Sequence, residues 1–131
     1  MKKIKGYIFS RPFLDERAPQ HIQNIVIREF CKKEGLNYSL SGVEYAMKDS
    51  YKTLYQLINE LKKYHGIVAY SLFQLPFNDI ERNKILKKIL NKKKTFYFAL
   101  EDFRLSTKKD LKKIENIWLV KKALPFCLKK I

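Results

Sequence analysis

Glycine and proline are scarce in this chain of 131 residues, with four of each, and two cysteines and one tryptophan are scarcer still. So little glycine and proline excludes collagen-like and low-complexity sequence, and a hydrophobic share of 46% excludes a disordered chain. No apolar run approaches the ~20 residues that a membrane-spanning helix needs. The apolar stretch after the basic start is too short for a secretory signal. We therefore expect one globular domain over residues 1–131 and a cytoplasmic protein.

The few residues that commonly bind metals are also poorly placed to do so. Cys31 and Cys127 lie far apart and match no metal-binding spacing, so we expect reduced thiols. His21 and His65 have no cysteine or histidine close to them in the sequence. There is no glycine-rich loop of the kind that cradles nucleotide phosphates. The sequence therefore predicts no metal and no cofactor.

Acidic residues are outnumbered, 13 against 28 lysines and arginines, which leaves a net charge of +15. Residues 81–131 hold 16 of the basic residues and only five of the acidic ones. These lysines alternate with isoleucine and leucine at helical spacing, which is typical of the solvated face of amphipathic helices. The distribution therefore argues against nucleic acid as the main partner. An anionic partner, whether nucleic acid, an acidic protein or a membrane surface, stays open as the alternative.

Segments typical of strands alternate with segments typical of helices. Strands are predicted at Ile4–Phe9, Leu36–Leu40, Ile67–Tyr70 and Thr95–Leu100. The first helix should run from Pro19 to Glu34 with Ile22, Ile25, Val26 and Phe30 on its apolar face, and residues 41–47 should form a loop. The second should begin at Asp49 or Ser50 and the third at Asn78 or Asp79. The apolar faces of these two helices are Leu54, Leu57, Ile58 and Leu61, and Ile85, Leu86, Ile89 and Leu90.

The last 30 residues are harder to interpret. A helix should open at Ser106 or Thr107, and Ile117–Val120 either continues it or forms an edge strand. Pro125 should limit whatever helix closes the chain. The apolar content of this part would suit a homodimer.

This alternation predicts right-handed crossovers and a parallel sheet. We expect a single three-layer α/β domain with a four- to five-stranded, mainly parallel sheet, in a flavodoxin-like order such as 2-1-3-4. Open sheets of this kind bind ligands outside the carboxyl ends of their strands. The residues expected at that edge are Ser10-Arg11, Ser41–Tyr45, Ser71–Gln74 and Glu101-Asp102.

Nine of the residues near this edge are candidates for function. Arg11 and Arg17 would hold an anion, unless Arg11 instead pairs with Asp15 or Glu16. Glu44 and Glu101 are the candidate acid–base groups, with pairing to the arginines as the alternative. Ser10 is a ligand or a nucleophile. Hydroxyl contacts are expected from Gln20, Gln23, Tyr45 and Ser71.

Gly6–Ser10, the helix entered at Ile22-Gln23, and Gly66–Tyr70 followed by Leu72–Leu75 resemble the catalytic domain of serine recombinases. The resemblance implies a resolvase-like fold and matches Ser10 to the nucleophilic serine of that family. However, Ile8 stands where the family has an arginine, and Gln74 and Phe77 replace the arginines that follow its third strand. Those cations stabilise the scissile phosphate, so the resemblance supports the fold and argues against strand exchange.

A second resemblance covers most of the chain, and its motifs include Ser10-Arg11-Pro12, Arg17, Pro19-Gln20, Gln23-Asn24, Glu44–Met47, Gly66–Val68, Tyr70–Phe73, Leu75-Pro76 and Phe98–Glu101. These motifs are similar to those of the "sporadic carbohydrate cluster" family. Genes of that family lie among those for bacterial surface polysaccharides such as O-antigen or capsule. The resemblance implies a context and a ligand class, and no reaction.

Our first hypothesis is a cytoplasmic protein of surface-polysaccharide biosynthesis that binds a phosphorylated or nucleotide-linked sugar. Whether it also modifies that sugar, and so whether it is an enzyme, is left open. One alternative is a non-enzymatic regulator or adaptor of the polysaccharide machinery. Another is a resolvase-fold protein that binds nucleic acid without recombinase activity.

Overall fold

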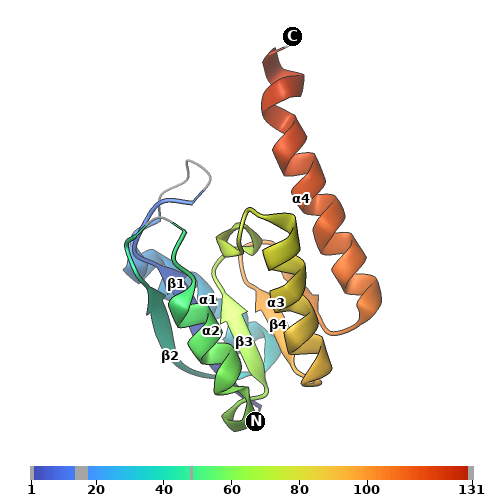
Figure 1. Cartoon of the computed structure of the whole chain (residues 1–131). Helices are drawn as coiled ribbons and strands as arrows, with labels where there is room; N and C mark the ends of the chain where they lie inside the picture. Colours follow the sequence, from blue (N-terminus) through green and yellow to red (C-terminus); the bar gives the residue numbers. More distant parts are fainter. Residues whose placement is uncertain (1, 14–17, 48, 130–131) are drawn as a thin grey trace.

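Five strands form one sheet in the order β2-β1-β3-β4-β5, with helices on both faces (Figure 1). The computed structural model describes residues 2–13, 18–47 and 49–129, and for 125–129 the backbone alone. The strands are β1 (Lys3–Phe9), β2 (Asn37–Glu44), β3 (Gly66–Ala69), β4 (Thr95–Phe98) and β5 (Phe103–Leu105). The helices are α1 (Gln20–Glu34), α2 (Lys52–Asn59), α3 (Asp79–Asn91) and α4 (Lys108–Lys129), with short 3₁₀ turns η1 (Leu61–Lys63) and η2 (Leu72–Gln74). This confirms the predicted α/β class and the order 2-1-3-4.

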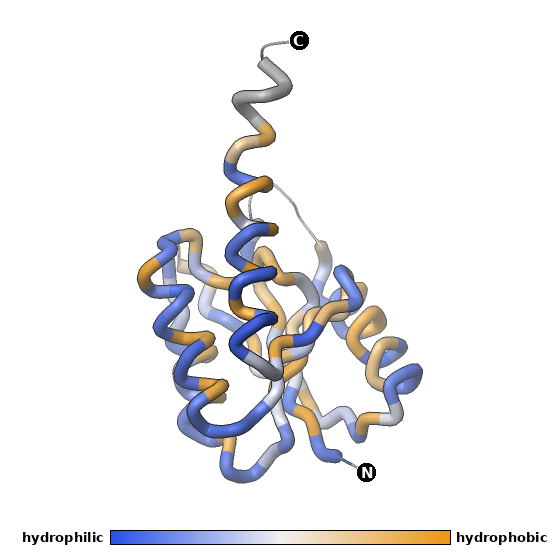
Figure 2. The backbone as a smooth tube through the Cα atoms, turned by 90° about the vertical axis from the view of Figure 1, so that its right-hand side faces the viewer, coloured by the Kyte–Doolittle hydropathy of each residue, from blue (hydrophilic) through white to orange (hydrophobic). Residues whose placement is uncertain are grey.

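The side chains of β1 alternate between two hydrophobic cores, one on each face of the sheet. Ile4 and Ile8 pack with Ile27 and Phe30 of α1. Tyr7 and Phe9 point the other way, into a larger core that α2, α3 and α4 cover. Figure 2 shows the resulting stripes of apolar residues along the helices. The sheet is therefore the middle of three layers, and its first four strands are parallel.

The buried face of α1 is only partly the predicted one. Phe30 is buried and Val26 packs against the same core, as predicted, but Ile22 and Ile25 are exposed. The helix also buries Gln23, Ile27 and Cys31. The helix is rotated because Gln23 lies against the end of β1 and hydrogen-bonds its backbone. The polar residue Gln23 thus lies on the same buried face of α1 as Ile27, Phe30 and Cys31.

Strand β2 is longer than predicted. Residues 41–44, which were expected in the loop 41–47, belong to the strand. The parallel ladder with β1 continues from Ser41 to Glu44, which pairs with Phe9. A register shift between Ile4 and Gly6 lets the two strands stay paired. Gly42 lies against Thr53 and Leu57, where there is little room for a larger side chain.

The end of the chain is one continuous helix, so Ile117–Val120 is helical and α4 runs past Pro125 to Lys129. The expectation that Pro125 limits this helix is therefore wrong. Strand β5, which pairs antiparallel with β4, was not predicted from the sequence. In Figure 1 the second half of α4 extends beyond the body of the domain. Among the described residues, none of the helices combines the length and the apolar character needed to cross a bilayer.

Candidate functional site

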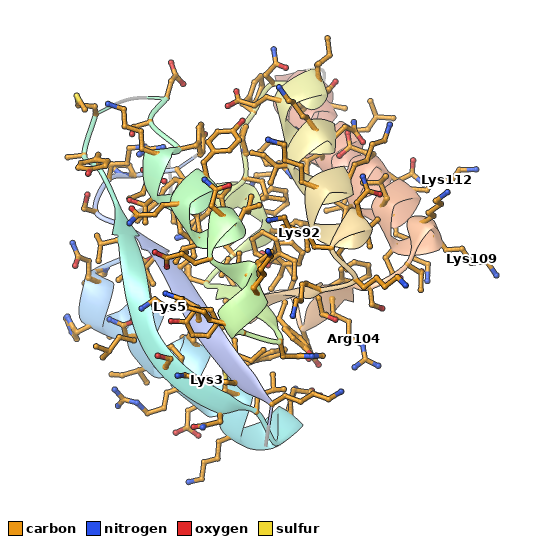
Figure 3. The ribbon with its side chains drawn as sticks, turned by 60° about the horizontal axis from the view of Figure 1, so that its bottom comes forward. Lys3, Lys5, Lys92, Arg104, Lys109 and Lys112 are labelled. Carbon is orange, nitrogen blue, oxygen red and sulfur yellow. The ribbon has the colours of Figure 1, made fainter. Side chains whose placement is uncertain are left out.

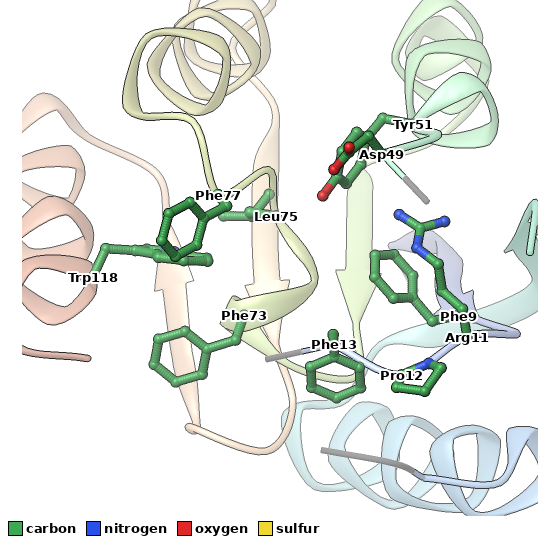
Figure 4. A pocket seen from close by; sticks show the side chains of 10 residues that line it. All are labelled: Phe9, Arg11, Pro12, Phe13, Asp49, Tyr51, Phe73, Leu75, Phe77 and Trp118. Atoms are coloured by element: carbon green, nitrogen blue, oxygen red, sulfur yellow. The ribbon is translucent and has the colours of Figure 1, made fainter. Parts of the chain in front are cut away.

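A cavity of about 480 Å³ opens near the carboxyl ends of β1 and β3 (Figure 4). Its lining comes from the loop after β1, the segment before α2, the segment around η2, and α4. The lining residues are Phe9, Arg11, Pro12, Phe13, Asp49, Tyr51, Phe73, Leu75, Phe77 and Trp118. We call this cavity the Arg11 cleft. It lies at the edge of the sheet where the sequence predicts a ligand site.

Arg11 is held firmly at one end of the cleft. Its Nη1 donates a hydrogen bond to the carbonyl of Tyr45 at 2.6 Å, and its Nη2 donates to the carbonyl of Ser50 at 2.9 Å. Its guanidinium lies 4.2 Å from the ring centre of Phe9 and 5.3 Å from that of Tyr51. A guanidinium has five N–H donors, and these two carbonyls hold the group in place at the end of the cleft. The alternative partners predicted for it, Asp15 and Glu16, lie outside the described residues.

Glu44 lies behind Arg11 and is only 1% exposed. Its Oε2 accepts from the Tyr7 hydroxyl at 2.8 Å and from the backbone N–H of Leu54 at 3.1 Å. Its Oε1 accepts from the N–H of Thr53 at 3.1 Å, the Ser50 hydroxyl at 3.3 Å and the N–H of Tyr45 at 3.2 Å. This carboxylate thus caps the N-terminus of α2, a place where a negative charge is stabilised. Neither Asp49 nor Ser50, the predicted caps, takes that role.

The hydrogen bonds of Glu44 suit a structural role better than a catalytic one. Burial raises the pKa of Tyr7 well above its usual value, and the adjacent Glu44 carboxylate raises it further. Glu44 does not line the Arg11 cleft. A role in proton transfer stays a prediction, and the contacts favour a role in positioning β2 and α2.

Ser10 follows β1 and is exposed. Its hydroxyl donates to the backbone carbonyl of Glu44 at 2.9 Å. Among the described side chains, none that could act as a base forms a hydrogen bond with this hydroxyl. The arrangement suits a contact to a ligand more readily than an activated nucleophile.

Gln23 is completely buried and joins three segments. It exchanges hydrogen bonds with both backbone groups of Phe9, at 3.0 and 2.9 Å, and donates to the carbonyl of Ala18 at 2.8 Å. Its Oε1 also accepts from Gln74 of η2 at 2.8 Å. Gln23 therefore links the end of β1 to Ala18 and to η2. Gln20, one turn earlier, is exposed.

The buried Ser71 and the partly buried Glu101 form a second hydrogen-bonded pair, after β3 and β4. Ser71 accepts from the N–H of Phe73 and donates to Glu101 Oε2 at 2.8 Å. Glu101 Oε1 accepts from the N–H of Leu72 at 2.7 Å. The pair holds η2 and its aromatic residue Phe73 against the sheet.

A further predicted ligand residue, Tyr45, lies apart from the cleft. Tyr45 is 52% exposed and does not line the cavity. Arg17 lies outside the described residues. The structure thus brings Arg11 to the cavity, places Ser10 beside it in the chain, and gives Gln23, Glu44, Ser71 and Glu101 supporting positions around it.

Phe73, Phe77 and Trp118 form an aromatic wall opposite Arg11 (Figure 4). None of the three is among the nine candidate residues. The Trp118 ring centre lies 5.3 Å from that of Phe73 and 6.0 Å from that of Phe77. Trp118 Nε1 is buried and, among the described residues, has no hydrogen-bond partner. A lone tryptophan in a lysine-rich helix was the available signal.

A buried arginine supports this wall from behind. Arg82 is 1% exposed and lies 4.3 Å from the Trp118 ring centre. It forms two hydrogen bonds with Glu115 of α4, at 2.8 and 2.9 Å, and donates to the carbonyls of Pro76 and Phe77. These contacts fix α4 against α3.

The described residues contain no group of three or more metal-binding side chains placed to hold an ion.

No family model matches the sequence, and no curated protein matches it. Among solved structures, the fold is similar to the N-terminal catalytic domain of TP901-1 integrase. The TM-score is 0.63 over 96% of this chain and 97% of that chain, at 14% sequence identity. At that identity the likeness shows the fold alone, and it supports the predicted resolvase-like fold. The resemblance to the sporadic carbohydrate cluster family stays a prediction from the sequence motifs.

Proposed function

We propose that this protein binds a phosphorylated or nucleotide-linked sugar in the Arg11 cleft and acts in bacterial surface-polysaccharide synthesis. The observation that carries the proposal is a fixed guanidinium at one end of a cavity with an aromatic wall. The polysaccharide context comes from the sequence motifs.

Arg11 supplies the anion contact. A guanidinium that is already held by two carbonyls loses little freedom when it binds a phosphate, and its planar N–H groups suit phosphate oxygens. Ser10 lies beside it in the chain and can add a hydroxyl contact. Arg17 belongs to the same loop and is proposed as a second cation for the same ligand.

The aromatic wall supplies the other half of the recognition. Phe73 is partly buried and Phe77 is 55% exposed, so both can contact a sugar or base face. A cavity of about 480 Å³ lies within the usual range for small-molecule sites. A ligand with a negative group at one end and a flat face at the other fits this arrangement.

A thermal-shift screen tests the proposal with UDP-, GDP-, dTDP- and CMP-linked sugars and hexose phosphates. A ligand at ten times its dissociation constant stabilises the native state by about 1.4 kcal/mol, which raises Tm by roughly 4 °C. We expect such a shift for at least one compound in the wild type and its loss in Arg11→Gln. No shift with any compound, or the same shift in Arg11→Gln, would contradict the proposal.

A second candidate function is nucleic-acid binding without recombination. The fold likeness to an integrase catalytic domain and the net charge of +15 favour it. It predicts a gel shift with duplex DNA that persists at physiological salt. A shift seen only at low salt would count against specific recognition.

A further inference from the structure

Seven lysines gather at the amino-terminal end of the sheet, away from the Arg11 cleft. They come from the start of β1, from η1, and from the connection between α3 and β4. We call this surface the lysine pole: Lys2, Lys3, Lys62, Lys63, Lys92, Lys93 and Lys94. Figure 3 views this end of the molecule and labels Lys3 and Lys92, with Arg104, Lys109 and Lys112 beyond them.

Backbone pairing brings these segments side by side. The N–H of His65 donates to the carbonyl of Lys3 at 2.7 Å, and the N–H of Thr95 donates to the carbonyl of His65. Lys3 and Lys94 therefore flank the segment that follows η1. Lys92 Nζ donates to the carbonyl of Ile58 at 3.0 Å, which places it at the end of α2, close to η1.

Little in the described structure neutralises this surface. Ion pairs among the described residues involve Lys33, Arg82 and Lys122, and none of the seven lysines of the pole. Six of the seven are exposed, and Glu60 is the acidic residue that adjoins η1 in the chain. The pKa of His65 is lowered, first by burial and then by the charges of Lys2 and Lys94.

Lys93 occupies a position where glycine is the usual residue. Its φ is +58°, in the left-handed region. Helix α3 ends with bonds from Lys93 N–H to Leu90 and from Lys94 N–H to Ile89. Helix α1 ends in the same way, but with Gly35 at the left-handed position. The chain thus carries a lysine at a conformationally unfavourable position in the middle of the pole.

We propose that the lysine pole docks the protein on an anionic lipid bilayer. Clusters of four to eight basic residues bind such surfaces, each lysine adding roughly fivefold to the partitioning at low salt. The seven residues of the pole are lysines, whose flexible point charge suits mobile lipid headgroups, whereas specific phosphate or base recognition favours arginine. The neighbouring arginine, Arg104, pairs with Tyr97, which contacts His65. Tyr64 is half-buried with Lys3 over its ring, so it offers no open stacking face for single-stranded nucleic acid.

Docking through this end leaves the Arg11 cleft accessible, because the cleft opens near the carboxyl ends of the strands. None of the seven lysines lines that cavity. The protein would therefore be held at the membrane surface with its ligand site facing away from the lipid.

Vesicle co-sedimentation tests this with phosphatidylcholine vesicles that contain or lack phosphatidylglycerol. We expect the wild type to bind only the anionic vesicles, and less at higher salt. The pole variant Lys62→Gln/Lys63→Gln/Lys93→Gln should bind about 100-fold more weakly. The control Lys52→Gln/Lys84→Gln/Lys87→Gln removes the same charge from exposed positions outside the pole and should bind like the wild type.

Three results would overturn the proposal. One is the absence of wild-type binding to anionic vesicles. Another is an equal loss of vesicle binding in the pole variant and the control variant, which would show that only the net charge matters. The third is tighter binding to a duplex DNA than to the anionic vesicles at the same salt, lost in the pole variant. Circular dichroism and Tm of both variants verify that the comparison is between folded proteins.

Discussion

At the scale of single residues, buried polar side chains fix the parts of this molecule that carry the cleft. Arg82, Glu44 and Gln23 are each at most 1% exposed and each satisfy several hydrogen bonds. A buried polar group that loses its partner costs free energy, because it can no longer reach water. These residues should therefore be sensitive to substitution without touching a ligand.

Arg82→Met should destabilise the protein by about 3 kcal/mol, because it leaves the partly buried Glu115 without its cationic partner and removes the cation beneath Trp118. Urea unfolding, followed by far-UV circular dichroism, measures this change. The control is Lys122→Gln, which removes an ion pair to the exposed carboxylate of Asp79 and should change stability by less than about 1 kcal/mol. Equal effects of the two substitutions would contradict this account of the α3–α4 contact.

Cys31 should be unreactive in the folded protein. It is 1% exposed, and burial raises the pKa of its thiol to about 11. At pH 8 only about one molecule in a thousand would then carry the reactive thiolate. In a Cys127→Ser variant, we expect a thiol reagent to label Cys31 slowly in buffer, faster as the pH rises, and rapidly in urea. Labelling in buffer at the unfolded rate would contradict the described burial.

The candidate residues could be found from the sequence, but their roles could not. Strand ends and residue types indicated Arg11, Glu44 and Gln23. The sequence does not show that the Glu44 oxygens face the first turn of α2, or that Gln23 points at the backbone of Phe9. Those directions depend on how the helices are rotated on the sheet, which is set by packing between distant segments.

At the scale of elements, close approach between strands explains one glycine, and backbone conformation explains another. A Cβ at Gly66 would lie 1.9 Å from the backbone oxygen of Thr95, so it would push β3 and β4 apart. A Cβ at Gly35 would meet nothing within 4 Å, but the residue has a φ of +69°.

Gly66→Ala should therefore destabilise the protein by more than about 3 kcal/mol, since the clash is with backbone. Gly35→Ala should lose only about 1 kcal/mol, the strain of a left-handed alanine. Thermal unfolding of the two variants measures the difference. The reverse order of the two effects would show that the β3–β4 register is not as described.

The sequence predicted which segments are strands and which are helices better than it predicted where they begin and end. The four parallel strands and four helices came from periodicity, and Asn78 was recognised as one of two possible caps of α3. The ends of β2 and α4 were missed, because the β2 ladder depends on its partner β1 and because α4 continues through a proline. The three residues of β5 carry too little pattern to be recognised.

At the scale of the whole molecule, charge and shape divide the protein into two ends. One end carries the Arg11 cleft with its aromatic wall, and the other carries the lysine pole. The net charge of +15 was visible in the sequence. The gathering of seven lysines at one end required the fold, because they come from three separate segments. The central claim concerns the first end, where Arg11 is proposed to hold the anionic part of a sugar ligand.

The most direct measurement of that claim is a fluorescence titration of Trp118, the single tryptophan, which lines the cleft. A nucleotide-linked sugar chosen by the thermal-shift screen should give a saturable change in the wild type. Loss of a charged hydrogen bond of about 2 kcal/mol should weaken binding roughly 30-fold in Arg11→Gln. Arg28→Gln, which removes the same charge from an exposed position on α1, should bind like the wild type. No saturable change in the wild type, or equal affinity in a folded Arg11→Gln variant, would contradict the account.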